Sequence, residues 1–248
     1  MVRPAAAAAA LLLAACAHGP SAKALKTAEI HHDLALEALQ KGAPQDALRE
    51  YDLALEADPS MAEAHMGRGL VMEYGLGRLP DAEAEYRRAI QLRPSYSSAH
   101  NNLGQLLART GRSEEAIKEF DEALASAFYR EPWVARCNKG QALYGMGRRD
   151  EGLAELRRCL SIAPRYCGGR RELGLILLNE GKLKEALEEL GTYARDCDKV
   201  VDAHLQLAQA RMKAGDVAGA RASFERCLEL AKGAPSGDAC RKGLELLQ

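Results

Sequence analysis

Cysteines and histidines are the side chains of this 248-residue chain that could carry chemistry, through disulfides, metal binding or nucleophilic catalysis. Their spacing matches no usual catalytic pattern, because the sequence has no C-x-x-C pair, no H-E-x-x-H, no G-x-S-x-G and no G-x-x-x-x-G-K-[ST]. The pair Gly67-x-Gly69 falls within an expected helix and does not follow a strand, which disfavours a phosphate loop. We therefore expect no catalytic residue, no metal site and no bound cofactor, and we interpret the chain as a non-enzyme.

A regular spacing of glycines predicts the elements that position these side chains. Six times, a glycine is followed five residues later by a small residue and four residues after that by an aromatic residue or leucine. A glycine with positive φ can end one helix, the small residue lets two helices approach, and the large residue fills the space beside them. The sets lie 34 to 36 residues apart: Gly42/Ala47/Tyr51, Gly77/Ala82/Tyr86, Gly111/Ala116/Phe120, Gly147/Gly152/Leu156, Gly181/Ala186/Leu190 and Gly215/Ala220/Phe224.

The helix before each turn glycine also carries a small residue, about two turns earlier. Over residues 28–232 this pattern resembles the consensus of tetratricopeptide (TPR) repeats, whose period is 34 residues. We expect an all-α fold, namely a TPR solenoid that forms a right-handed superhelix of about six helix-turn-helix repeats. Residues 233–248 are expected to add a C-terminal capping helix, which an open-ended stack needs. The small residues are Ala35, Gly69, Gly104, Gly140, Gly174 and Ala208.

The repeat register selects a disulfide pairing among the cysteines that follow Cys16. In an antiparallel helix pair, facing residues lie at nearly equal distances from the turn, and Cys137 and Cys159 centre one residue past Gly147. The alternative is that Cys159 and Cys227 only replace the small core residue found in other repeats. The register predicts three bonds: Cys137–Cys159, Cys167–Cys197 centred one residue past Gly181, and Cys227–Cys240 centred in the last loop.

The histidines follow the repeat as well. His31, His65, His100 and His204 each stand four residues before the small residue of a first helix. They are therefore interpreted as copies of one structural position spread along the solenoid, and a shared metal site is disfavoured.

The N-terminus is typical of an export signal. Arg3 precedes an apolar run over residues 5–15 that is too short to span a bilayer. The sequence Leu13-Ala14-Ala15-Cys16 resembles the bacterial lipobox, which implies cleavage before Cys16 and acylation of that cysteine. The next residue is Ala17 and not aspartate, which by the same resemblance implies sorting to the outer membrane. We expect a lipoprotein signal peptide over residues 1–15 and a lipidated tether over residues 16–27. The alternative is a generic signal peptide in which the cysteine has no role.

Length and charge limit the other classes of function. Residues 16–248 suffice for one six-repeat solenoid and no second globular domain, and we expect a monomer. The formal net charge of −1 argues against a nucleic-acid partner.

TPR proteins bind partners along the surface lined by the first helix of each repeat, and the turn glycines place that surface in the sequence. On this surface, repeats one and two present apolar side chains, which suit an amphipathic partner helix. Repeats three and four present polar side chains there, which include Arg109 and Gln141. Alternatively, some of these side chains pack as core against neighbouring helices. The predicted groove consists of Leu36, Leu39, Met66, Leu70, Tyr74, Asn101 and Gln105.

A closer resemblance rests on the lipobox, the run Asn101-Asn102-Leu103-Gly104, an expansion after the third repeat containing Tyr129-Arg130-Glu131-Pro132, and bulky Tyr193. Together these features resemble the type IV pilus pilotins of the PilF/PilW family, to which Tgl belongs. The six cysteines after Cys16 depart from that family's pattern, since not all members have them.

The resemblance implies an outer-membrane lipoprotein that faces the periplasm and binds secretin subunits, promoting their assembly into multimers for type IV pilus biogenesis and pilus-dependent motility. The alternative is a periplasmic TPR adaptor that scaffolds peptidoglycan enzymes or the outer-membrane β-barrel assembly machinery.

Overall fold

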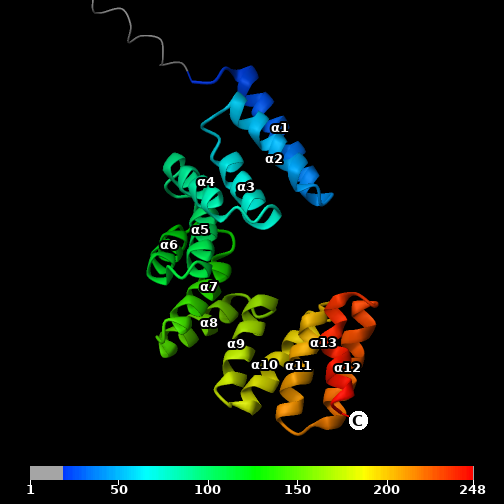
Figure 1. The fold of residues 1–248 in the computed structure, drawn as a ribbon. Helices are drawn as coiled ribbons and strands as arrows, with labels where there is room; N and C mark the ends of the chain where they lie inside the picture. The colour runs from blue at the N-terminus through cyan, green and yellow to red at the C-terminus, as the bar shows by residue number, and fades with distance from the viewer. Residues whose placement is uncertain (1–18, 248) are drawn as a thin grey trace, which may run out of the picture. The chain divides into compact units, whose positions relative to one another are not determined.

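The computed structural model describes residues 19–247, so the predicted signal peptide and Cys16 lie outside the described residues. Within this range all regular structure is helical, which confirms the all-α prediction (Figure 1). The elements are α1 (Ala22–Gln40), α2 (Pro44–Ala57), α3 (Ala62–Leu70), the π-helix η1 (Val71–Gly75), α4 (Leu79–Leu92), α5 (Ser97–Arg109), α6 (Ser113–Ala125), α7 (Pro132–Gly145), α8 (Arg149–Ile162), α9 (Cys167–Asn179), α10 (Leu183–Asp196), α11 (Val201–Lys213), α12 (Val217–Ala231), the 3₁₀-helix η2 (Pro235–Gly237) and α13 (Asp238–Glu245).

Helices α1 to α12 form the pairs of six repeats, each pair joined by a short turn at one of the predicted glycines. All six turn glycines have positive φ, from 68° at Gly77 to 83° at Gly147. The chain divides into two compact units, Met1–Leu103 and Gly104–Gln248, with the boundary inside α5.

The small residue of each first helix lies against the large residue of the second. A Cβ added to Gly104 would lie 2.6 Å from Cε1 of Phe120, and one added to Gly174 would lie 2.6 Å from the Leu190 side chain. The six large residues are at most 1% exposed: Tyr51, Tyr86, Phe120, Leu156, Leu190 and Phe224. The sequence motif is therefore the contact between the two helices of one repeat.

The second repeat contains one extra residue. Gly69 lies eight residues before its turn glycine, whereas its counterparts lie seven residues before theirs. The chain accommodates the extra residue in the π-helix η1, which keeps Gly69 against Tyr86 (2.6 Å from an added Cβ) and leaves Tyr74 60% exposed.

A basic residue on the first helix and a glutamate on the second form an inter-helix pair in several repeats. His65 Nδ1 lies 2.7 Å from Glu85 Oε2, while its Nε2 lies 3.2 Å from the carbonyl oxygen of Pro59, six residues earlier. His100 and His204 make the same contact to the carbonyl six residues earlier, at 2.9 Å in each case, which confirms that these histidines occupy one repeated structural position. Further pairs of this kind among the described residues include His31–Glu50, Arg136–Glu155 and Arg170–Glu189.

Replacement of Glu85 tests what an inter-helix pair contributes. Burial disfavours the charged form of Glu85, but hydrogen bonds from His65 and Arg68 outweigh it and hold the pKa of this carboxyl below its ordinary value of 4.5. Because the folded-state pKa is lowered, the stabilisation is complete above pH 4.5 and is lost as the pH falls through the lower folded-state value. We expect Glu85→Gln to reduce the free energy of unfolding by about 1–3 kcal/mol at pH 7.

The difference between Glu85→Gln and the parent protein should shrink in urea titrations below pH 4.5. A matched control is Glu83→Gln, since Glu83 pairs with Arg87 within one helix at the surface. A difference that stays constant from pH 7 to pH 3 would contradict the role of the Glu85 charge.

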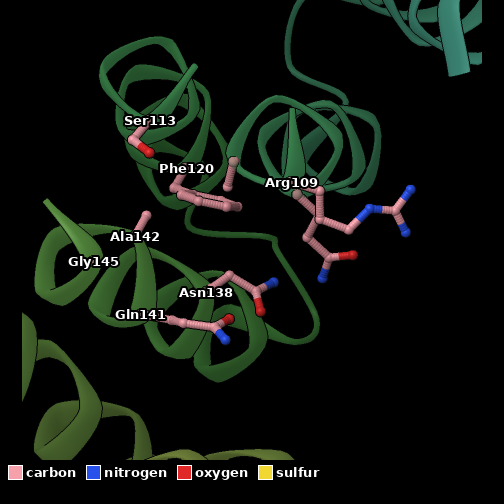
Figure 2. Close-up of a pocket in the computed structure, with 9 residues that line it drawn as sticks. Arg109, Ser113, Phe120, Asn138, Gln141, Ala142 and Gly145 are labelled. Carbon is pink, nitrogen blue, oxygen red and sulfur yellow. The ribbon is translucent and has the colours of Figure 1, made fainter. Parts of the chain in front are cut away.

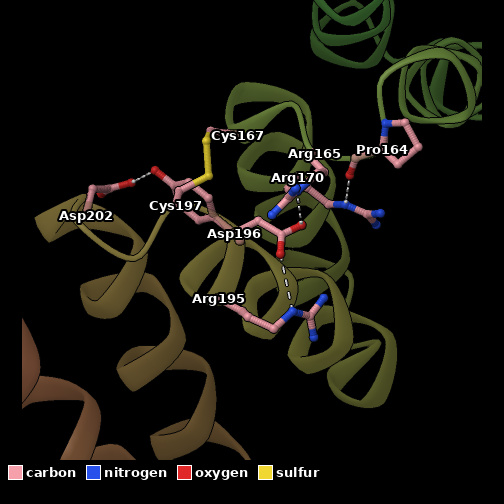
Figure 3. The surroundings of a disulfide bond; sticks show 9 residues. Pro164, Arg165, Cys167, Arg170, Arg195, Asp196, Cys197 and Asp202 are labelled. Atoms are coloured by element: carbon pink, nitrogen blue, oxygen red, sulfur yellow. Dashed lines mark hydrogen bonds and ion pairs between the residues drawn. A yellow bond between two sulfur atoms is a disulfide. The ribbon is translucent and has the colours of Figure 1, made fainter.

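The three predicted disulfides are present. Cys137–Cys159 joins α7 to α8, Cys167–Cys197 joins α9 to the end of α10, and Cys227–Cys240 joins α12 to α13. Their Cα atoms are 5.4, 6.2 and 6.2 Å apart. Figure 3 shows the second bond beside Asp196, which ion-pairs with Arg165 and Arg195. The pairing predicted from the repeat register is therefore confirmed.

Helix α13 covers the last repeat. Gly243 lies directly against the ring of Phe224, as the small residue of a first helix does elsewhere, and Leu244 packs in the same cluster. The Cys227–Cys240 bond fixes α13 to α12.

Candidate partner-binding site

A cavity of about 430 Å³ lies between the third and fourth repeats, entirely within the unit that begins at Gly104. Its walls come from the first helices of these repeats, α5 and α7, and α6 contributes to its floor (Figure 2). The ring of Phe120, which is fully buried, forms part of that floor with Ala108 and Ala142. The cavity thus lies on the surface where the sequence analysis places the groove.

Carboxamides dominate the polar lining of this cavity. Gln105 projects from α5, and Asn138 and Gln141 project from α7, with Arg109 and Ser113 completing the polar set. A carboxamide offers both a donor and an acceptor, as does each peptide unit of an extended chain. Three carboxamides above an apolar floor are therefore suited to bind the main chain and one apolar side chain of a polypeptide segment.

A hydrogen-bonded ladder continues from this cavity across the first helices of the next repeats. Gln141 Nε2 donates to Glu172 Oε2 at 3.1 Å, and Arg171 donates to Glu172 Oε1 at 2.7 Å. Arg171 Nε also donates to Asp202 Oδ2 at 2.8 Å, and Gln206 donates to Asp202 Oδ1 at 2.9 Å. The ladder links α7, α9 and α11, and it orients the side chain of Gln141.

One guanidinium in the ladder lies between two carboxylates. Burial disfavours the charged form of Arg171, but Asp202 and Glu172 outweigh it and raise the pKa of its guanidinium. Burial, followed by the neighbouring Asp202, raises the pKa of Tyr193 to about 12, and the Tyr193 hydroxyl donates to Asp202 at 3.3 Å. Tyr193, the bulky residue of the fifth repeat, therefore helps to hold Asp202 of the ladder in place.

The apolar residues of the predicted groove belong to the other unit and have different environments. Leu36 on α1 is 41% exposed and Tyr74 on η1 is 60% exposed, so both offer surface to a partner. Met66 and Leu70 are half-buried, and Met66 Sδ accepts a hydrogen bond from Asn102 at 3.6 Å.

Two residues of the predicted groove offer little surface. Leu39 packs against the core of the first repeat, and Asn101 is only 5% exposed. Both lie one residue away from the helix face that is open, because a step of one residue turns a helix by about 100°. Gln105 is the predicted groove residue that lines the cavity.

The sequence analysis missed two features. Asn138 stands three residues before Gln141, and this spacing places both on one face of α7. Phe128 in the loop between α6 and α7 is 95% exposed, the largest value among the exposed large apolar side chains of the described residues. The Asn138 signal was present in the helical spacing, whereas nothing in the sequence distinguishes an exposed Phe128 from a buried one.

Within residues 19–247, no cluster of three or more His, Cys, Asp or Glu side chains could hold a metal ion. No helix of the same range combines the length and the hydropathy needed to cross a membrane.

The sequence matches tetratricopeptide repeat models along most of its length. One model matches residues 32–73, 72–129 and 171–235, and a second matches residues 135–166. The chain therefore belongs to the tetratricopeptide repeat family.

Solved structures of TPR proteins resemble the chain over most of its length. PilW, a widely conserved type IV pilus biogenesis factor, matches with a TM-score of 0.76 and 25% identity over 88% of this chain and 98% of PilW. PilF of Pseudomonas aeruginosa matches with a TM-score of 0.72 and 21% identity over 89% of this chain and 99% of PilF. MamA shares the fold at a TM-score of 0.55 and 22% identity over 70% of this chain and 93% of MamA. No curated protein matches the sequence at a significant level.

Proposed function

We propose that this chain is a pilotin of type IV pilus biogenesis, an outer-membrane lipoprotein that binds secretin subunits and promotes their multimerisation. In this proposal the signal peptide is removed, and a lipid on Cys16 anchors the chain so that its repeats face the periplasm. The main support is the likeness to PilW, which extends over 98% of that protein and so is not limited to one generic repeat.

Two further observations support the proposal. Three disulfides within residues 137–240 are compatible with an oxidising compartment and therefore with export. The carboxamide-lined cavity is suited to a polypeptide partner, because it offers paired donors and acceptors to a main chain.

The mechanism follows from these parts. The cavity between α5 and α7 holds an extended segment of the secretin subunit, and the exposed apolar side chains of Leu36 and Tyr74 provide a second contact surface. The lipid anchor confines the captured subunit to the membrane surface, which raises its effective concentration for assembly.

Deletion of the gene tests the proposed function directly. We expect loss of heat-resistant secretin multimers and of surface pili, with the secretin subunit still synthesised. Intact multimers with normal pili would reject the pilotin function. General defects of the cell wall or of outer-membrane β-barrels would favour the adaptor alternative.

A double change in the cavity tests the binding site. Asn138→Ala with Gln141→Ala removes two carboxamides from the lining. Each lost hydrogen bond costs about 1 kcal/mol, so we expect roughly tenfold to hundredfold weaker binding of a purified secretin subunit, measured by titration calorimetry.

The matched control is Gln209→Ala, because Gln209 precedes Gly215 by six residues just as Gln141 precedes Gly147, but it does not line the cavity. If the double variant binds the secretin subunit as tightly as the control does, the binding site does not include this cavity. In that case the variant Leu70→Asp with Tyr74→Asp, which adds charge to the apolar surface, is tested in the same way. Weaker secretin binding by this variant would identify the α3–η1 region as the contact.

A further inference from the structure

The sixth repeat lacks the glutamate that completes the inter-helix pair. In the second repeat His65 pairs with Glu85, and in the fifth Arg170 pairs with Glu189. At the corresponding position of the sixth repeat, facing His204, stands Ser223. Ser223 is only 4% exposed. Compared with the other repeats, the sixth therefore lacks a negative charge at this buried position but keeps the basic residue His204.

A cavity of about 320 Å³ lies at this position, between α10, α11 and α12. The cavity is widely open to solvent, and its volume is near the lower end of the roughly 300–1,000 Å³ that small-molecule sites occupy. Its lining includes three arginines, Arg195, Arg211 and Arg226, together with His204 and Ser223. Among the lining residues within the described part of the chain there is no carboxylate.

The arginines are held in different ways. Arg211 is fixed, because its Nη1 donates to the carbonyl of Gly219 at 3.0 Å and to the hydroxyl of Ser223 at 2.8 Å. The side chains of Arg195 and Arg226 are 71% and 44% exposed. They can therefore turn toward a ligand at little cost.

Each arginine also has an acidic neighbour outside the cavity lining. Arg195 lies 3.3 Å from Asp196, Arg226 lies 2.9 Å from Glu229, and Arg211 lies 3.7 Å from Asp216. Exposed pairs contribute about 0–1 kcal/mol, so an anion with two or three oxygens can compete for Arg226, whose partner Glu229 is 65% exposed. Asp196 is only 14% exposed, but it keeps Arg165 as a second partner when Arg195 turns away.

We propose that this cavity binds a phosphate group, either on a lipid headgroup or on a soluble phosphate compound. Arg211 and the Ser223 hydroxyl form the fixed part of the site, and Arg195 and Arg226 close over the phosphate oxygens. Guanidinium groups match phosphate geometry through paired hydrogen bonds, which is why arginines are suited to this role. The site is separate from the carboxamide-lined cavity and does not depend on the pilotin function.

The experiment titrates the full protein, purified in detergent from its host, with inorganic pyrophosphate, using calorimetry at low and at moderate salt. We expect saturable binding by the parent protein. Ser223→Glu restores the glutamate of the other repeats and should abolish binding without removing any arginine. Arg195→Gln with Arg226→Gln should weaken binding at least tenfold.

Arg241→Gln is the matched control for the arginines, since Arg241 pairs with Asp238 one turn away, as Arg226 pairs with Glu229. It should leave pyrophosphate binding unchanged. A second titration with dihexanoylphosphatidic acid, a water-soluble lipid, distinguishes the sources. Tighter binding of this lipid than of pyrophosphate assigns the site to a headgroup, and the reverse order assigns it to a soluble phosphate.

Absence of saturable pyrophosphate binding would overturn the proposal. Binding that persists in folded Ser223→Glu protein, with an unchanged circular dichroism spectrum, would overturn it as well. Neither result would affect the test by gene deletion, because that test reports on secretin assembly alone.

Discussion

Reduction of the disulfides is expected to unfold the last three repeats while the first two remain folded. The bonded cysteines are 22, 30 and 13 residues apart in the sequence. In the loop-entropy model each bond contributes about 3 kcal/mol to the free energy of unfolding. Their sum of about 9 kcal/mol is comparable to the 5–15 kcal/mol that stabilise a typical domain. All three bonds lie between residues 137 and 240, within the unit that begins at Gly104.

Hydrogen exchange read by mass spectrometry, with and without reductant, measures this effect by region. Peptides from α7 to α13 should exchange much faster after reduction, whereas peptides from α1 to α4 should keep their protection and serve as the internal control. Equal acceleration in both regions would contradict the regional role of the bonds. So would full protection of α9 and α10 in the reduced protein.

Gly152→Ala is expected to cost about 3 kcal/mol of unfolding free energy, at the upper end of overpacking effects. A Cβ at Gly152 would lie 2.7 Å from the carbonyl oxygen of Gly140 and 2.8 Å from the backbone nitrogen of Tyr144. Both are main-chain atoms of α7, so α7 and α8 would have to move apart. The Cys137–Cys159 bond between the same helices opposes that movement.

The control is Gly191→Ala in α10, where an added Cβ would meet no atom within 4 Å. Alanine is the better helix former by about 0.5–1 kcal/mol, so this change should stabilise the protein. The shift of the urea midpoint measures both variants. Two shifts of the same sign would contradict the close approach of α7 and α8.

Much of the fold could be predicted from the sequence because its signals are local and repeated. A turn glycine, a small residue and a large residue recur in six copies, and each copy determines one helix pair. The register of these copies also predicted the disulfides, since facing positions of a helix pair follow from the turn alone. Cys159 and Cys227 do replace a small core residue, but each is bonded to a partner across a helix pair.

The parts that escaped prediction depend on exact angles around a helix axis. One extra residue in the second repeat is accommodated in the π-helix η1, on which Tyr74 is exposed. Leu39 is half-buried against the core of the first repeat and Asn101 is buried, although both were expected in the groove. The cavity needs side chains from three helices at once, so the sequence indicated Gln105 and Gln141 but missed Asn138.

The two termini of the array differ in what they leave uncovered. Helix α13, bonded to α12 through Cys240, covers the final repeat, whereas α1 exposes Ile30 by 50% and Leu34 by 42%. Head-to-tail polymers need one adhesive surface at each end of the subunit. Stacking of a second copy directly on α12 would therefore require α13 to move against its bond to that helix, whereas Ile30 and Leu34 of α1 are already accessible.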